Sequence, residues 1–132
     1  MALDFSSLKR ALVNFEKAII RAEADKSDEE IRDAVIQRFE YSYELSWKML
    51  KRQLELESAN SEIYDKMSFR ELIREGAESG YIRNPEMWFK FREARNKTSH
   101  NYEEKNAKEV YLVAITLLEE ARDLLNSMEN RK

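Results

Sequence analysis

The sequence has no cysteine, one proline and two glycines in 132 residues. Without cysteine the chain cannot form disulfide bonds, thiolate metal sites or a cysteine nucleophile, which agrees with a reducing compartment. Such scarce glycine and proline leave few backbone breaks. Charged residues make up 37% and apolar residues 42% of the chain. This composition is typical of amphipathic helices, and it predicts an all-α protein.

Long hydrophobic runs are also missing. The first 20 residues, "MALDFSSLKRALVNFEKAII", contain charged side chains at short intervals, so neither a signal peptide nor a membrane span is predicted. We therefore expect a cytoplasmic protein without membrane attachment. The length suits one domain with a buried core, and no repeat, linker or low-complexity tract divides it. We expect a single helical domain over residues 1–132.

The chain as a whole has no excess of positive charge, because it contains 23 Lys and Arg and 26 Asp and Glu. A net charge of -3 argues against general affinity for nucleic acid. One segment differs, because between residues 83 and 97 five basic residues face only Glu86 and Glu93. Such a run usually forms a solvated helix face, and phosphate binding is the alternative. The five basic residues are Arg83, Lys90, Arg92, Arg95 and Lys97.

Apolar residues recur at spacings of three and four and predict the helices. A first helix of about 20 residues begins near Phe5. Ser27 and Glu30 have the spacing of a capping box, which predicts the start of a second helix of about 30 residues that ends near residue 57. The period is then lost in "ESANSEIYDKM".

Three further helices follow from similar signals. Ser68 and Glu71 form a second capping box and open a short helix that Gly80 ends. Asn84 and Pro85 start a fourth helix. Asn106 with Glu109 is expected to cap a last helix of about 20 residues. We predict an up-and-down four-helix bundle with one additional short helix, whose core aromatic residues are Phe15, Phe39, Trp47, Trp88 and Phe91.

The end of the fourth helix, "FREARNKTSHNYEEKN", contains the single histidine. His100 follows Arg95 by five residues and precedes Tyr102 by two. On a regular helix Arg95 and Tyr102 project from one side and His100 from a neighbouring one, but fraying after Ser99 would let the imidazole border a cleft with Arg95. A group that titrates near pH 7 can take a proton from the 2′-hydroxyl of RNA, and an arginine can stabilise the phosphorane. The pair suits RNA cleavage without a metal.

Other chemistries fit this segment less well. One histidine with Glu103 and Glu104 is a poor set of zinc ligands. No glycine-rich phosphate loop is present, so ATP-dependent phosphoryl transfer lacks its parts, and a Ser-His-Asp triad cannot be argued from one histidine. A purely structural alternative stays open, in which His100 caps the helix and Tyr102 packs.

The segment "RNKTSHNYEE" resembles the Arg-x4-His-x-Tyr signature of the HEPN superfamily, with Asn96 as the polar residue expected after the arginine. "FEYSYELSWKMLKRQLE", "SFRELIREGAESGYI" and Trp88 add to the likeness. In this order, the blocks resemble the nucleotidyltransferase substrate-binding branch of that superfamily over about residues 5 to 125.

This resemblance implies a partner protein and two alternative functions. Members of the branch resemble the helical substrate-binding half of aminoglycoside nucleotidyltransferases and are typically encoded beside a small, separate nucleotidyltransferase of the minimal type. In one function the chain is a non-catalytic subunit that presents a substrate to that partner. In the other it is a ribonuclease toxin that cuts RNA, and the partner is an antitoxin that transfers AMP to Tyr102.

The toxin function implies roles for the motif residues. Arg95 and His100 would be catalytic, and Asn96 and Ser99 would support them. The superfamily completes its site across a symmetric homodimer, and no cofactor or metal is expected. The intact motif favours the toxin over the binding subunit. Arg92, which precedes the motif, and Lys97, which lies within it, are candidates for phosphate binding.

Overall fold

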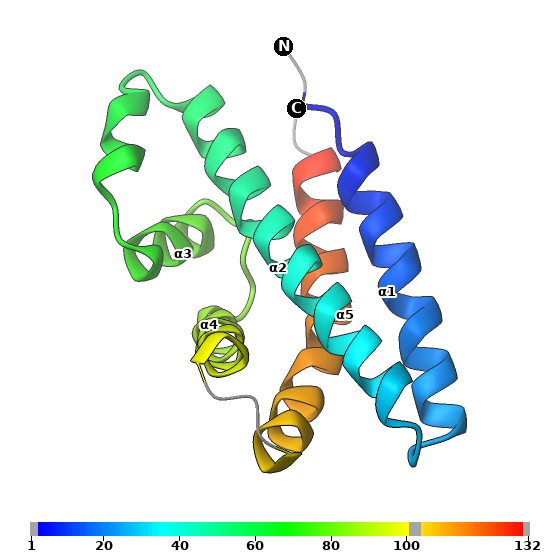
Figure 1. Ribbon diagram of the computed structural model, residues 1–132. Helices are drawn as coiled ribbons and strands as arrows, with labels where there is room; N and C mark the ends of the chain where they lie inside the picture. Colours follow the sequence, from blue (N-terminus) through cyan, green and yellow to red (C-terminus); the bar gives the residue numbers. More distant parts are fainter. Residues whose placement is uncertain (1–2, 101–103, 131–132) are drawn as a thin grey trace.

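The computed structural model describes residues 3–100 and 104–130, with the backbone alone at 99, 100, 104 and 105. The described residues form helices and no strand, so the predicted all-α fold of four long helices and a short one is confirmed (Figure 1). A 3-10 helix, η1, adds to the prediction where the apolar period is lost. The elements are α1 (Ser6–Ala24), α2 (Glu29–Glu57), η1 (Ser61–Lys66), α3 (Phe69–Glu78), α4 (Pro85–His100) and α5 (Glu104–Asn130).

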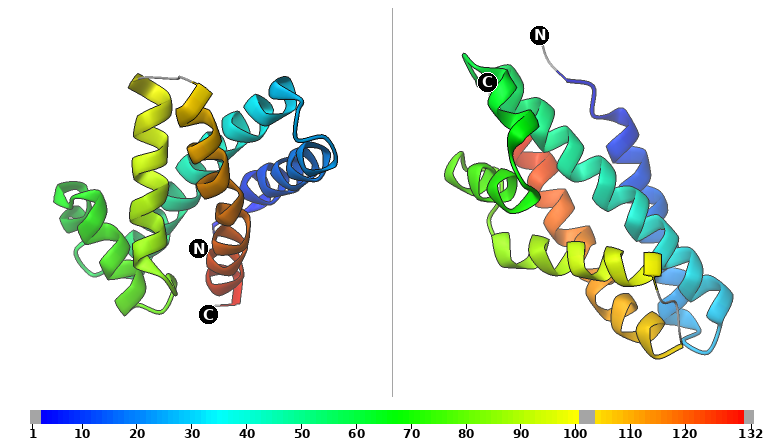
Figure 2. Two further views of the ribbon diagram at one scale, coloured as in Figure 1. Left: turned by 90° about the horizontal axis from the view of Figure 1, so that it is seen from below. Right: turned by 60° about the vertical axis from the view of Figure 1, so that its left-hand side comes forward.

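The long helix α2 organises the molecule. It packs against α1 on one side and α5 on another, and it also contacts η1 and α3 (Figures 1 and 2). The helix α4 packs on α5 and α3. Because its C-terminal end returns towards α2, the segment with the Arg-x4-His motif lies beside the middle of the longest helix. No helix in the described residues combines the length and apolarity needed to cross a bilayer.

The predicted cap of α2 was wrong by one residue. Asp28 Oδ1 accepts hydrogen bonds from the backbone N–H groups of Glu30, at 3.0 Å, and Ile31, at 3.2 Å. Ser27 instead donates its backbone N–H and its hydroxyl to Asp25 Oδ1. Since the turn at Asp25 engages Ser27, the next short polar side chain takes the capping position.

Both predicted ends of α3 are confirmed. The Ser68 Oγ accepts from the Glu71 N–H at 3.2 Å, and Glu71 Oε1 accepts from the Ser68 N–H at 3.0 Å. Hydrogen bonding of the carboxylate by the backbone N–H and the side chain of Ser68 lowers the pKa of the Glu71 carboxyl. At the other end Gly80 has a φ of 87°, and the Tyr81 N–H donates to the Gly76 carbonyl at 2.8 Å. This left-handed glycine closes a Schellman motif.

The fourth helix begins at Pro85 as predicted, but the start predicted for the last helix was wrong. The helix α5 begins at Glu104 and has 27 residues, so Asn106 lies in its first turn rather than at its cap. Ala107 and Val110 are each 1% exposed. The small side chain of Ala107 extends the apolar stripe before Val110, and the helix therefore extends beyond the polar residue that resembled a cap.

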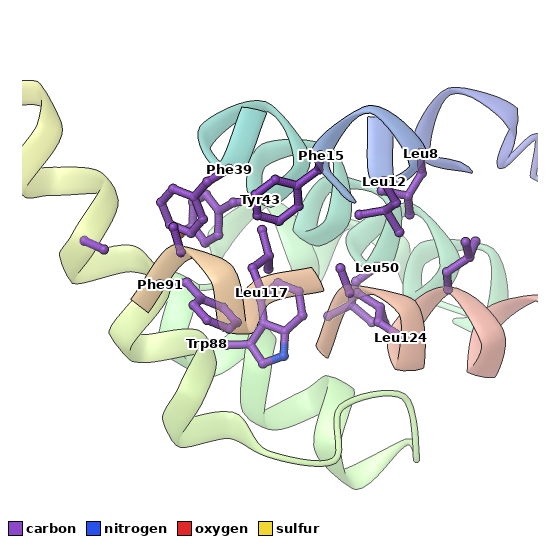
Figure 3. Packing of buried hydrophobic residues seen from close by; sticks show 14 of the residues in the cluster. Leu8, Leu12, Phe15, Phe39, Tyr43, Leu50, Trp88, Phe91, Leu117 and Leu124 are labelled. Atoms are coloured by element: carbon purple, nitrogen blue, oxygen red, sulfur yellow. The ribbon is translucent and has the colours of Figure 1, made fainter. Parts of the chain in front are cut away.

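Aromatic side chains from α2 and α4 meet in the core (Figure 3). Phe91 lies edge-to-face with Trp88, with ring centroids 5.2 Å apart, and 6.3 Å from Phe39. These rings and Phe15 are buried as predicted, whereas Trp47 is only partly buried against Phe69. Burying each large side chain contributes about 1.5–3 kcal/mol to folding, so this cluster fixes α4 against α2.

Candidate functional site

Arg95 lies at the border between the core and solvent. Phe91 and Ala94 are buried on the inner face of α4, and the Arg95 side chain, next to them, is 32% exposed. Its Nε is 3.3 Å from Glu40 Oε2 and 3.9 Å from Glu44 Oε1. Two carboxylates one turn apart on α2 therefore hold the guanidinium in place. Each of the three side chains is about one-third exposed, so the ion pairs orient Arg95 more than they stabilise the fold.

Tyr43 lies close to two basic residues of the predicted site, Arg92 and Arg95. Burial raises its pKa to about 12, and the positive charges of Arg92 and Arg95 oppose that shift. The phenol is therefore neutral near pH 7. The Arg92 guanidinium also lies 4.9 Å from the centroid of the Phe69 ring of α3. The structure thus places Arg92 and Arg95 on the side of α4 that faces α2 and α3.

The other predicted site residues are placed differently. Lys97 is exposed, and its Nζ lies 3.5 Å from Glu109 Oε2 of α5, so it faces away from Arg92. Asn96 is exposed on the last turns of α4. Ser99 and His100 belong to α4, but their side chains lie outside the described part of the structure, as does the whole of Tyr102.

The excess of basic residues between 83 and 97 is largely compensated by acidic residues from other helices. Arg83 Nη2 lies 2.8 Å from Glu120 Oε2 and 3.2 Å from Glu119 Oε1, both on α5. These carboxylates raise the pKa of the Arg83 guanidinium. With Arg95 and Lys97 also paired, Lys90 and Arg92 are the residues of this group that form no ion pair within the described ranges.

Arg95 lines an open cleft between α1 and α2. Its volume is about 770 Å³. Most of its lining residues have polar side chains, and α1, α2 and α4 all contribute to it. Sequence analysis did not single out this set, although Glu40, Tyr41 and Glu44 lie in the block "FEYSYELSWK". The lining residues are Ser7, Arg10, Ala11 and Asn14 of α1, Gln37, Arg38, Glu40, Tyr41 and Glu44 of α2, and Arg95.

A protein-family model described as "Nucleotidyltransferase substrate binding protein like" matches residues 3–130. The chain belongs to this family. The match extends over nearly the whole sequence, and it confirms the resemblance to the nucleotidyltransferase substrate-binding branch of the HEPN superfamily.

One relative of this chain is a Haemophilus influenzae protein named "Probable ribonuclease HepT". The two sequences are 38% identical over 96 residues, which are 73% of this chain and 66% of the relative. The aligned region thus spans just under two thirds of the relative's length.

Two solved structures share the fold. A Haemophilus influenzae protein, described as having the fold of a substrate-binding domain of a nucleotidyltransferase, has a TM-score of 0.89 and 29% identity. The similarity covers 96% of this chain and 100% of that one. A Thermus thermophilus protein has a TM-score of 0.73 and 25% identity, over 94% of this chain and 99% of that one. Both comparisons include all the long helices, because they extend over nearly the full chain.

Proposed function

We propose that this protein is a HEPN-type toxin, a metal-independent endoribonuclease that acts as a homodimer. One observation carries the proposal: the motif arginine, Arg95, is oriented by two carboxylates and lines an open cleft. A surface arginine with only a structural role needs no such cleft. The likeness to a relative named as a probable ribonuclease supports the same chemistry.

In the proposed reaction His100 takes the proton from the 2′-hydroxyl of RNA. The 2′-oxygen attacks the neighbouring phosphorus, and the bond from phosphorus to the 5′-oxygen breaks. The products are a 2′,3′-cyclic phosphate and a 5′-hydroxyl end. The leaving 5′-oxygen must gain a proton, and a chain with one histidine has no second imidazole for this step. In a symmetric dimer, His100 of the second copy supplies it.

Arg95 has the second role in this proposal. Its planar guanidinium can donate two parallel hydrogen bonds to the phosphate and stabilise the extra negative charge of the phosphorane. Glu40 and Glu44 hold the group at the cleft before RNA binds, and the phosphate then competes with them for its N–H groups. Asn96 and Ser99 support the motif, and Arg92 adds positive charge near Tyr43. Lys97 is a weaker phosphate candidate because it pairs with Glu109.

The family implies a partner, a small nucleotidyltransferase of the minimal type. In the toxin proposal this partner is an antitoxin that attaches AMP to Tyr102. A second function is favoured by the descriptions of the family and of one solved relative, both of which name nucleotidyltransferase substrate binding. In that alternative the chain is a non-catalytic subunit that presents a substrate to the partner.

RNA cleavage by the purified chain tests the toxin proposal. We expect cleavage that persists in EDTA and leaves a 2′,3′-cyclic phosphate. His100→Ala should lower the rate by about 10² to 10⁴-fold, because a general base contributes about that much. Arg95→Lys should also lose RNA cleavage, because lysine lacks the planar guanidinium that can donate two parallel hydrogen bonds to a phosphate. Expression of the unmodified chain should stop bacterial growth, and His100→Ala should relieve the arrest.

The matched control is Arg122→Lys, which changes another ion-paired arginine, outside the motif and the cleft, that pairs with Glu16 at 2.8 Å. It should leave cleavage unchanged. If the chain cuts no RNA and does not affect growth, the binding-subunit alternative is correct. A strict requirement for a metal ion would place the chemistry at another site.

A further inference from the structure

The cleft between α1 and α2 is lined by more basic than acidic side chains. Arg10 and Arg38 are exposed on its two sides, and the two lining glutamates, Glu40 and Glu44, both lie against Arg95. Neither Arg10 nor Arg38 forms an ion pair within the described ranges. In a protein with a net charge of -3, two guanidinium groups beside one cleft that form no ion pair among the described residues favour an anionic ligand.

An aromatic side chain lines the same cleft as these arginines and Arg95. Tyr41 is 58% exposed, although a ring of this size is usually largely buried in a helical protein. It follows Arg38 by one turn of α2, and both line the cleft. An exposed ring beside free guanidinium groups suits a ligand that combines flat bases with phosphates.

The remaining lining argues against an apolar occupant. Ser7, Asn14 and Gln37 are exposed polar residues, and Ala11 is the only aliphatic side chain among the lining residues. A protein helix that docked here would find no apolar stripe to cover. A nucleic acid strand would find hydrogen-bond donors and acceptors, positive charge and a stacking surface.

We infer that the α1–α2 cleft binds the single-stranded RNA segment next to the phosphate that is cut. Tyr41 stacks on one base, and Arg10 and Arg38 contact the flanking phosphates. Because Arg95 of α4 lines the same cleft as residues of α2 and α1, a strand whose reacting phosphate lies on Arg95 continues along this cleft towards α1. This assignment rests on the proposed ribonuclease function and adds a binding track to it.

Binding can be measured apart from cleavage with an RNA whose riboses are all 2′-O-methylated, because this RNA has no attacking hydroxyl. We would use a fluorescein-labelled, mixed-sequence strand of about 12 nucleotides and measure fluorescence anisotropy with the full chain. Tyr41→Ala should weaken binding about tenfold, the effect of one lost stacking contact, and Tyr41→Phe should restore it. Arg38→Ala should lower the slope of log affinity against log salt by about one.

Arg52→Ala is the matched control. Arg52 is an exposed arginine of the same helix, outside the cleft. Its replacement should leave both the RNA affinity and the salt slope unchanged, in contrast to Arg38→Ala. The assignment is wrong if Tyr41→Ala and Arg38→Ala bind this RNA like the unmodified chain, or if the unmodified chain does not bind it. It is also wrong if the two variants alter sedimentation but not RNA affinity, because the cleft would then be a contact between copies.

Failure of the ribonuclease proposal and failure of the cleft assignment give different results in these experiments. If natural RNA stays intact while binding of the methylated strand depends on Tyr41 and Arg38, the cleft is a nucleic-acid site without cleavage. If natural RNA is cut in a His100-dependent manner while Tyr41→Ala and Arg38→Ala bind normally, the ribonuclease proposal stands and the cleft assignment fails.

Discussion

The guanidinium of Arg95 is held by residues from a helix far upstream in the sequence. Glu40 and Glu44 are spaced by one turn of α2, so both carboxylates reach the same group. The pairing limits the rotamers of a long side chain before a ligand arrives. At the scale of single residues, the Arg95 guanidinium is therefore positioned before a ligand binds.

Tyr102 is where we expect the partner to act. Incubation with ATP, magnesium and the partner nucleotidyltransferase should attach AMP to this residue and abolish RNA cleavage. The added phosphodiester carries negative charge and lies close in sequence to Arg95, so it competes with the substrate phosphate for the same guanidinium. Peptide mass spectrometry gives the mass and the position of the modification.

Tyr102→Phe is the control, and it should stay unmodified and remain active. Two other tyrosines, the exposed Tyr41 and the half-buried Tyr111, should carry no AMP, and the Tyr111 hydroxyl already donates to Glu23 Oε2 at 2.6 Å. Transfer of AMP only to a small molecule bound by this chain would support the binding-subunit alternative instead.

At the scale of elements, α4 presents the motif and is anchored by its aromatic residues. Phe91 is fully buried one turn before Arg95, against Trp88 and Phe39. Phe91→Ala should lower the free energy of unfolding by about 3–5 kcal/mol, the usual effect of removing a buried phenyl ring. Urea unfolding followed by circular dichroism measures this difference.

The comparison for that variant is Leu112→Ala on α5. Leu112 is 66% exposed, and its truncation should change the free energy of unfolding by at most about 0.5 kcal/mol. Equal effects of the two substitutions would show that the aromatic cluster does not hold α4. In folded samples of Phe91→Ala, RNA cleavage should also fall, because Arg95 loses its fixed position on the helix.

At the scale of the whole molecule, we expect a homodimer with the 88–104 regions of both chains at its interface. The reaction needs a base and an acid, and each chain supplies one histidine. A two-fold axis brings two copies of one surface together, so it can place both imidazoles at one cleft. Sedimentation velocity should show a dimer. A monomer throughout the micromolar range, without concentration dependence, would remove the shared-site mechanism.

Much of the helical framework could be predicted because it depends on near neighbours. The spacing of apolar residues predicted α1 and α2, and the Ser68–Glu71 box and Gly80 predicted both ends of α3. The error at the cap of α2 arose where two candidates competed locally. Asp28 caps α2 because Ser27 is engaged by Asp25, and no pattern of residue types alone separates these two outcomes.

The sequence by itself therefore determined the helices, the family signature and the position of the motif at the end of α4, since these depend on contacts within a few residues. Only the tertiary structure decided which charges remain uncompensated. Arg83, Arg95 and Lys97 lie in one basic segment, but each meets a carboxylate from α2 or α5. The α1–α2 cleft beside Arg10 and Arg38 likewise exists only where the helices meet, because the packing of distant helices sets the distances between their charges.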